Sequence, residues 1–436
     1  MWSRQSRSGG NKPHPVILLL VSAALSFGAV AGAHADIPAD ALPGARLASM
    51  LEWLDAHHPE LAVARLERDA ALMRVQPAGA LPDPMLAVEW RDIRYDSPTL
   101  DPTQVGAMRY QFRQSIPLWG KRDLRGQVAE AGVVTATAQQ GQTRLALRNR
   151  LKRAYTEWVA GHETLRHLVE LQRVMDDAER LLRGRYAAGL IGQAEVLRAQ
   201  AELASLQNDQ VTTQAEVRRA RVRINALLLR PVDAPLAEPS GFASLPKAVD
   251  WTRLAGRLEV KMERENPQLQ QAAAQVEAGM HTAELVRRNR WPDLTVGVAP
   301  LQTGSRFDTW ELMLEINLPL QRESRRQQER EAGYQVAAAE ARRAALAANL
   351  KGELAESVVG YEAALHHLHV LETTLLPQIE LAWRAAYAAY ASGGGDYAAL
   401  LEAQRVWKKA RIDAVMAARD AHLALAEIEL RVGGEL

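Results

Sequence analysis

The sequence has 436 residues, of which 24% are charged and none is cysteine. Lysine and arginine total 53 and aspartate and glutamate total 52, so the formal net charge is +1 and composition gives no bulk attraction to nucleic acid. The lack of cysteine excludes disulfides, thiolate metal sites, cysteine nucleophiles and a lipid attached through an N-terminal cysteine. The length suffices for two ordinary domains or one elongated body.

Residues 1–35 have the pattern of a cleaved export signal. Three basic residues precede an apolar run from Val16 to about Ala33, and Ala33-His34-Ala35 fits an A-x-A cleavage site. The alternative is a single membrane anchor, but the many small residues of the run favour cleavage. No later stretch is apolar for long enough to cross a bilayer as a helix, so we expect strands to do so if the exported chain enters a membrane.

Landmarks in the first half of the chain return in the same order about two hundred residues later. His58-Pro59-Glu60-Leu61 returns as Asn266-Pro267-Gln268-Leu269, and Leu81-Pro82-Asp83-Pro84 returns as Trp291-Pro292-Asp293-Leu294. Ordered recurrence of this kind predicts an internal duplication. We place the first repeat at 36–230, a proline-rich linker at 231–262 with a short helix around Trp251 to Leu258, and the second repeat at 263–436. The linker is either a plain spacer or a collar beside the helices.

Each repeat is predicted to run helix, strand, loop, strand, long helix, turn, helix. In the first repeat a helix begins at Glu60 and ends near Val75, and a proline-free helical pattern later extends from about Lys121 to Ala187. That helix would be about 100 Å long at 1.5 Å per residue. The other elements of this repeat are strands at about 85–91 and 108–116, a turn near 189–192 and a return helix from Ala194 to about Leu229.

The second repeat follows the same plan with a shorter loop between its strands. Its predicted elements are strands at about 294–299 and 309–318, a helix from Arg322 to Ala391, a turn near 393–395 and a helix from Tyr397 to Arg431.

All four strands alternate apolar and polar residues, which gives each strand one apolar and one polar face. Leu86, Val88 and Trp90 lie on the apolar face of the first strand, and Trp310, Leu312 and Leu314 on that of the fourth. An apolar outside and a polar inside suit a membrane barrel that encloses water. A soluble sandwich, with the polar faces as ordinary surface, is the alternative. In the barrel, the lumen would be lined by Glu89, Arg91, Arg109, Gln111, Arg113, Glu311, Glu315 and Asn317.

Four strands cannot close a membrane barrel, because open strand edges leave backbone groups unpaired in lipid. The sequence therefore predicts that further copies of the chain complete the sheet.

The signal segment, the duplicated layout and the openings at Asn266 and Trp291 together resemble the TolC-type outer-membrane efflux proteins. The segment Ser115-Ile116-Pro117-Leu118-Trp119-Gly120-Lys121-Arg122 resembles the strand-to-helix junction of the branch that exports heavy metals. The resemblance covers about Leu47 to Val432. It implies a mainly α-helical chain with a transmembrane β part, in which three copies form a twelve-stranded outer-membrane β-barrel and a long periplasmic α-helical barrel.

The resemblance also implies a function and partners. The chain would be the exit duct of a tripartite efflux system in the cell outer membrane, docked on a periplasmic adaptor and an inner-membrane proton-driven pump. Export through it would be passive, so no catalytic residue, cofactor or bound metal is expected, and the substrate would be a heavy-metal cation or an organic toxin. The rival is a periplasmic adaptor, but adaptors carry one helical hairpin and this chain carries two.

Two sets of residues acquire roles through the resemblance. The helix-hairpin tips would meet the adaptor, although glycine at a turn also has a simple conformational explanation. Glu402, just past the second turn, would form a carboxylate ring that closes the periplasmic end, or is an ordinary exposed helix glutamate. The tip residues are Arg185, Tyr186, Gly189, Leu190 and Ile191 of the first hairpin and Tyr390, Gly393, Gly394, Gly395 and Asp396 of the second.

Other candidate sites are weaker. His366 and His369 share a helix face at i,i+3 and could bind a metal, but a solvated helix face is the better interpretation. No serine, histidine and carboxylate set suggests nucleophilic chemistry, and Gly120-Lys121 lacks the upstream glycines of a phosphate loop.

Overall fold

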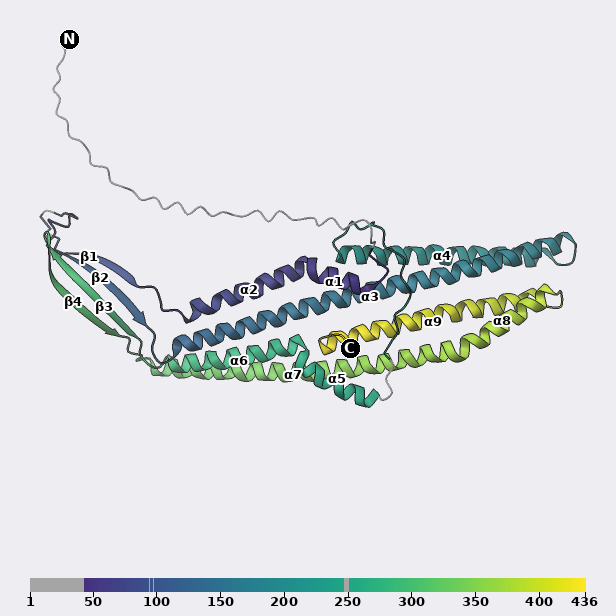
Figure 1. Cartoon of the computed structure of the whole chain (residues 1–436). Coiled ribbons are helices and arrows are strands. Elements are labelled where there is room, and N and C mark those ends of the chain that lie inside the picture. The colour runs from purple at the N-terminus through teal and green to yellow at the C-terminus, as the bar shows by residue number, and fades with distance from the viewer. Residues whose placement is uncertain (1–42, 94, 97, 247–250) are drawn as a thin grey trace, which may run out of the picture. The chain divides into compact units, whose positions relative to one another are not determined.

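A computed structural model of the chain describes residues 43–93, 95, 96, 98–246 and 251–436. The predicted signal segment, 1–35, lies outside the described residues. Within them the two repeats follow one another with the same order of elements (Figure 1). The first repeat contains α1 (Leu47–His57), α2 (Pro59–Gly79), β1 (Met85–Arg91), β2 (Ala107–Ile116), α3 (Lys121–Ala187) and α4 (Gln193–Leu227). The rest contains α5 (Trp251–Glu265), α6 (Pro267–Arg288), β3 (Leu294–Thr303), β4 (Arg306–Ile316), α7 (Arg322–Val370), the π-helix η1 (Leu371–Leu375), α8 (Leu376–Ala391) and α9 (Tyr397–Val432).

The duplicated landmarks are helix caps. His58 Nδ1 accepts a hydrogen bond of 3.2 Å from the backbone N–H of Glu60 at the start of α2. Asn266 Oδ1 accepts bonds of 2.8 and 3.3 Å from the N–H groups of Gln268 and Leu269 at the start of α6. A proline follows each cap, where its missing N–H costs nothing. The two repeats therefore begin their first long helix with the same device.

Two prolines act differently from the sequence expectation. The helix predicted to end near Val75 continues through Pro77 to Gly79, because a proline in the last turn removes only one hydrogen bond. The helix predicted to run unbroken from Arg322 to Ala391 is instead α7, η1 and α8. Pro377 lies just after η1 and has no N–H, and the wider π-turn lets the helical path continue across it.

The strands form one antiparallel sheet in the order β1-β2-β3-β4. The β1–β2 connection spans 92–106, whereas β3 and β4 join through a tight turn at Gly304 with φ +59°. The shorter second loop, predicted from the sequence, is thus present. The sequence pattern predicts the fourth strand at about 309–318. In the structure β4 begins at Arg306 and ends at Ile316, two or three residues earlier at each end.

The helices pack as two hairpins joined along α3. The α3 helix contacts α2, α4, α6 and α9, while α7 packs against α6 and α9 and α8 against α9. Trp158 of α3 and Ile224 of α4 share a buried cluster with Met50 of α1. Close approach is built in at Gly161, where a Cβ atom would lie 2.7 Å from Val217 Cγ2.

The linker is held against both repeats. Ala237 N–H donates to the carbonyl of Pro43 at 3.0 Å, and Phe242 stacks on His422 of α9 with ring centroids 5.1 Å apart. The Tyr361 hydroxyl of α7 donates to the carbonyl of Pro246 at 2.9 Å. The described part of the linker therefore packs as a collar rather than hanging free as a spacer.

No helix among the described residues combines the length and apolarity needed to cross a membrane.

Candidate functional site

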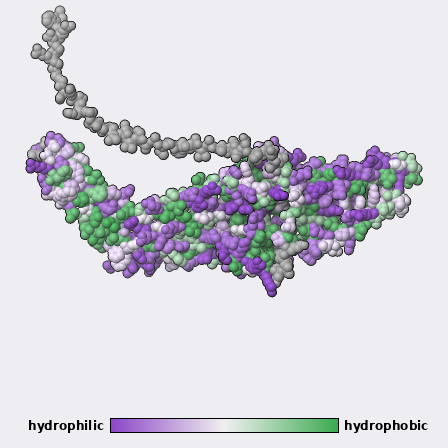
Figure 2. Space-filling model, viewed as in Figure 1, coloured by the Kyte–Doolittle hydropathy of each residue, from purple (hydrophilic) through white to green (hydrophobic). Residues whose placement is uncertain are grey.

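The apolar face of the sheet is exposed. Cross-strand pairing sets Leu86, Phe112, Val298 and Leu312 in one row across all four strands. Leu86 is 70% exposed, Leu312 88% and Trp310 72%. Figure 2 shows hydrophobic side chains gathered over the part of the sheet next to the helices. A soluble sandwich would bury its apolar face against a second layer. Here the apolar face is exposed, so this sheet does not form the core of such a sandwich within one chain.

Charged side chains meet on the other face. Arg109 of β2 lies between two carboxylates, with Nε 2.8 Å from Glu311 Oε2 and Nη1 3.4 Å from Glu89 Oε2. The Gln111 amide is 3% exposed and donates to Met313 Sδ at 2.9 Å. This face therefore carries both signs of charge in close pairs.

The predicted lumen residues do not all lie in the centre of this face. Arg113 shares it, and Glu315 lies opposite Thr295. Arg91 ends β1 beside the long connection, and Asn317 lies just after β4, where its N–H donates to the Asp293 carbonyl at 3.3 Å. Gly297 leaves room here, because an added Cβ would lie 3.2 Å from both Arg113 Cγ and Met313 Cε.

A compact junction joins the end of β2 to the start of β3. Lys121, the first residue of α3, is 2% exposed; its Nζ donates to Asp293 Oδ1 at 2.8 Å and to the Trp291 carbonyl at 2.9 Å. The Trp119 indole donates to the Pro292 carbonyl at 2.9 Å, and its ring lies 5.3 Å from that of Trp291. The sequence placed Gly120-Lys121 in the segment that resembles a strand-to-helix junction and argued against a phosphate loop there, but it did not pair Lys121 with Asp293. The repeated Pro-Asp motif was the signal that could have linked it to the second repeat.

The two hairpin tips touch each other. Arg185, at the end of α3, donates through Nη2 to the Tyr390 carbonyl at 3.1 Å and lies 4.8 Å from the centre of the Tyr390 ring. Tyr390 and Tyr397 are buried, and burial raises the pKa of Tyr397 to about 12. Tyr390 therefore holds the tips together from inside.

The other predicted tip residues lie at or near the surface. Gly189 and Gly393 have φ +73° and +89°, as their turns require, and Gly395 is close to the backbone of Tyr390. Exposed positions are Tyr186, Gly189, Leu190, Gly393, Gly394 and Asp396, with Ile191 and Gly395 half-buried.

Glu402 is exposed on α9 and has no ion pair within the described residues. Close to it in sequence, Arg405 and Lys408 reach across to α4. Glu202, only 5% exposed, accepts from Arg405 at 2.9 Å, and Lys408 Nζ lies 3.1 Å from Asp209 Oδ2. This α4–α9 network was not found from the sequence, because pairs between distant helices have no local spacing signal.

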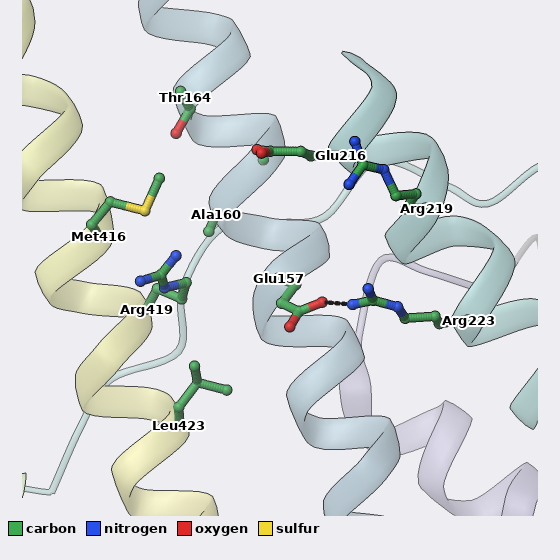
Figure 3. Close-up of a pocket in the computed structure, with 10 residues that line it drawn as sticks. Glu157, Ala160, Thr164, Glu216, Arg219, Arg223, Met416, Arg419 and Leu423 are labelled. Carbon is green, nitrogen blue, oxygen red and sulfur yellow. Dashed lines mark hydrogen bonds and ion pairs between the residues drawn. The ribbon is translucent and has the colours of Figure 1, made fainter. Parts of the chain in front are cut away.

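A groove with mixed charge lies between α3, α4 and α9 (Figure 3). Glu157 of α3 pairs with Arg223 of α4, while Arg419 and Met416 face the groove from α9. The charges on its walls are partly neutralised by this pair.

Candidate metal ligands do not converge. His366, His367 and His369 are exposed near the end of α7, and no group of three or more histidine, aspartate or glutamate side chains in the described part of the chain could hold a metal ion.

A family model described as outer membrane efflux protein matches residues 51–228 and 260–434, which correspond to the two repeats. The chain belongs to the outer membrane efflux protein family. Its four-stranded sheet and paired helical hairpins are the fold of that family. The family places the chain in the cell outer membrane, with its helices in the periplasm, among channels rather than enzymes.

Solved structures of outer-membrane channels share this fold. The channel OprN matches with a TM-score of 0.75 at 20% identity, covering 89% of this chain and 90% of that one. VceC from Vibrio cholerae matches with a TM-score of 0.73 at 19% identity, covering 89% and 96%. CusC matches with a TM-score of 0.74 at 13% identity, covering 89% and 92%. Comparison with curated protein sequences gives no significant match.

Proposed function

We propose that three copies of this chain form one tube that serves as the passive exit duct of a tripartite efflux system. One chain leaves β1 and β4 as sheet edges, and an unpaired edge is costly in lipid. Three copies would give twelve strands and no edge. The exposed apolar face, with Trp310 and Leu312, is the observation that carries the proposal, because it suits contact with hydrocarbon.

The polar face would line the water-filled lumen. Glu89, Arg109 and Glu311 pair across strands, so the wall keeps charge close to the aqueous path without a large excess of one sign. A wall of this kind favours passage of hydrated solutes of either charge. Selectivity would then be set mainly by the pump that feeds the duct.

The hairpin tips would dock the periplasmic adaptor. Exposed Tyr186 and Leu190 offer apolar contact, and Asp396 offers a charge beside the glycine turn. The contact between Arg185 and Tyr390 couples the two tips, so an adaptor that moved one hairpin would move the other.

Glu402 would contribute to a periplasmic gate. An exposed carboxylate repeated by symmetry around a narrow pore attracts cations and repels anions. The network of Glu202, Arg405 and Lys408 would hold α9 against α4 near this point.

We further propose heavy-metal cations as the substrate, on the resemblance of Ser115 to Arg122 to the metal-exporting branch. An organic toxin is the alternative. Deleting the gene and measuring the growth-inhibiting concentrations of metal salts and of organic toxins distinguishes the two. Increased sensitivity to organic compounds alone would remove the metal proposal and leave the duct in place.

The duct itself is tested by conductance of the purified protein in a planar bilayer, with its mass measured in detergent. We expect stable single-channel steps from a complex of three chains. Recovery of the protein only from the soluble periplasmic fraction, or absence of any pore from the trimer, would overturn the proposal.

A further inference from the structure

We propose that Leu81-Pro82-Asp83 of one copy docks into a groove at residues 318–325 of the next copy, with Asp83 paired to Arg322. This contact rests on the proposed trimer and specifies how its subunits join where the strands meet the helices.

The chain already contains the same contact once, between its own repeats. Trp291-Pro292-Asp293 lies against the end of β2 and the start of α3: Asp293 Oδ1 accepts from the Leu118 N–H at 3.2 Å and from Lys121 Nζ at 2.8 Å. The Pro292 carbonyl accepts from the Trp119 indole. The three-residue segment that precedes the first strand of one repeat thus packs against the strand-to-helix junction of the other.

The duplication assigns counterparts to both sides of this contact. Leu81-Pro82-Asp83 corresponds to Trp291-Pro292-Asp293, and Leu318-Pro319-Leu320 corresponds to Ile116-Pro117-Leu118. Counted from the shared proline, the position that matches Lys121 is Glu323, but the first residue of α7 is Arg322, as Lys121 is the first residue of α3. A cation therefore stands at the first position of both long helices, and an aspartate stands in both segments that precede a strand.

The second copy of the contact is unfilled within one chain. A groove lined by Leu318, Pro319, Leu320 and Arg322, together with Trp291 and Pro292 of the same chain, lies open at the start of α7. Leu320 is 80% exposed there, whereas its counterpart Leu118 in the filled contact is half-buried. Neither the Asp83 carboxylate nor the Arg322 guanidinium has a hydrogen bond or ion pair within the part of the chain that the structure describes, and both residues are exposed.

The location of these groups favours a second copy as the occupant. Asp83 precedes β1 and Arg322 follows β4, and β1 and β4 are the two edges of the sheet. Joining β4 of one copy to β1 of the next brings these two junctions together, just as joining β2 to β3 brings Lys121 to Asp293.

The duplication also fixes the strand register at the seam. Ile116 lies opposite Leu294 within the chain, so Leu318 lies opposite Pro84 of the next copy. The antiparallel pairing then sets Ile316 opposite Leu86 and Glu311 opposite Arg91. This register continues the apolar face across the seam and pairs opposite charges on the polar face, whereas a slip of one residue would reverse both.

Cysteine crosslinking tests the docking, because the chain has no native cysteine. We expect a Leu86→Cys, Ile316→Cys variant to form disulfide-linked trimers in outer-membrane fractions, since paired strand positions have Cβ atoms close enough for a disulfide. An Asp83→Cys, Leu320→Cys variant treated with a short bis-maleimide should likewise give covalently linked trimers. The matched control, Ile116→Cys with Leu294→Cys at a strand pair within the chain, should crosslink only within one chain.

Charge reversal tests the ion pair separately. Asp83→Arg and Arg322→Asp should each lower the temperature at which the trimer dissociates in detergent, and the double variant should restore it. An intact trimer that gives no crosslink at either designed pair overturns the docking and leaves the duct in place. Failure of the wild-type chain to form a trimer overturns the proposed function and this contact with it.

Discussion

Lys121 Nζ lies 2.8 Å from Asp293 Oδ1, and this ion pair joins the first helix position of one repeat to the segment that opens the sheet of the other. Lys121 is almost fully buried, while Asp293 stays partly exposed. The lysine also donates to the Trp291 carbonyl, so a single ammonium group holds both the backbone and the side chain of the second repeat.

Removing this ammonium should destabilise the chain strongly. We expect Lys121→Met to lower the free energy of unfolding by about 3 kcal/mol, because Asp293 and the Trp291 carbonyl lose their shared donor. Chemical denaturation in detergent measures this change. Lys351→Met is the control: Lys351 pairs with Glu259 at an exposed site, and its loss should hardly move the midpoint. Equal effects of the two variants would contradict the role given to Lys121.

A larger residue at Gly161 should push α3 and α4 apart. A Cβ there would lie 2.7 Å from the branched side chain of Val217, so we expect Gly161→Leu to lower the free energy of unfolding by about 2 kcal/mol or more. Gly360 is the corresponding position of the second repeat, and nothing lies within 4 Å of a Cβ added to it. Gly360→Leu should therefore leave stability unchanged or raise it slightly, and melting temperatures of the two variants give the comparison.

A charge on the apolar sheet face should impair insertion. Leu312 is 88% exposed on that face, and we expect Leu312→Arg to cost about 2–4 kcal/mol if it faces the middle of the bilayer. Thr309 lies on the opposite face, beside Leu301, so Thr309→Arg should be tolerated. The amount of trimer recovered from outer membranes measures both. Full recovery of Leu312→Arg would show that this face does not meet lipid.

Arg109 should control the ion preference of the pore. It neutralises Glu89 and Glu311, and Arg109→Gln would leave both carboxylates uncompensated. We expect the reversal potential in a salt gradient to shift toward cation selectivity. Arg290→Gln, at an exposed position outside the strands, should not shift it. An unchanged reversal potential in Arg109→Gln would place the polar face away from the conducting path.

Acid should weaken the collar through His422. Burial against the linker lowers the pKa of His422, and its hydrogen bond to the Ala243 backbone opposes this only in part. As pH falls through about 6.5, the unfolded state binds a proton that the folded state resists, so stability falls with acidification. We expect the melting temperature to drop between pH 7.5 and 5.5. The drop should be smaller in His422→Asn, and an equal drop would assign the effect to other groups.

The repeated layout and the two faces of the sheet could be predicted from the sequence because both depend on local periodicity. Arg109 and Glu311 stand on polar positions of alternating strands, and the structure sets them on one face. The cap at Asn266 is also consistent with residue type and position, since asparagine is a preferred N-cap and proline follows it, whereas histidine at the matching position 58 is not a typical cap.

Contacts between elements far apart in the chain could not be predicted in this way. The pairing of Glu202 with Arg405 depends on how α4 and α9 pack, which no spacing within either helix specifies. Burial of Tyr390 between the tips also needs the first hairpin, with Leu182 and Val196, in place. The π-turn before Pro377 reflects a choice between breaking and widening a helix at the proline, and the sequence pattern does not specify which of the two occurs.

The exposure of Trp310 and Leu312 bears on how the molecule is made. A newly exported chain crosses the aqueous periplasm before it reaches the outer membrane. There the apolar face of its strands would be exposed to water and prone to aggregation. Its helices, in contrast, already pack into buried apolar clusters within one chain. We therefore expect the helical part to fold first, while the strands are kept from aggregating by a bound chaperone. The sheet would complete its folding only on insertion into the membrane, together with the other two copies.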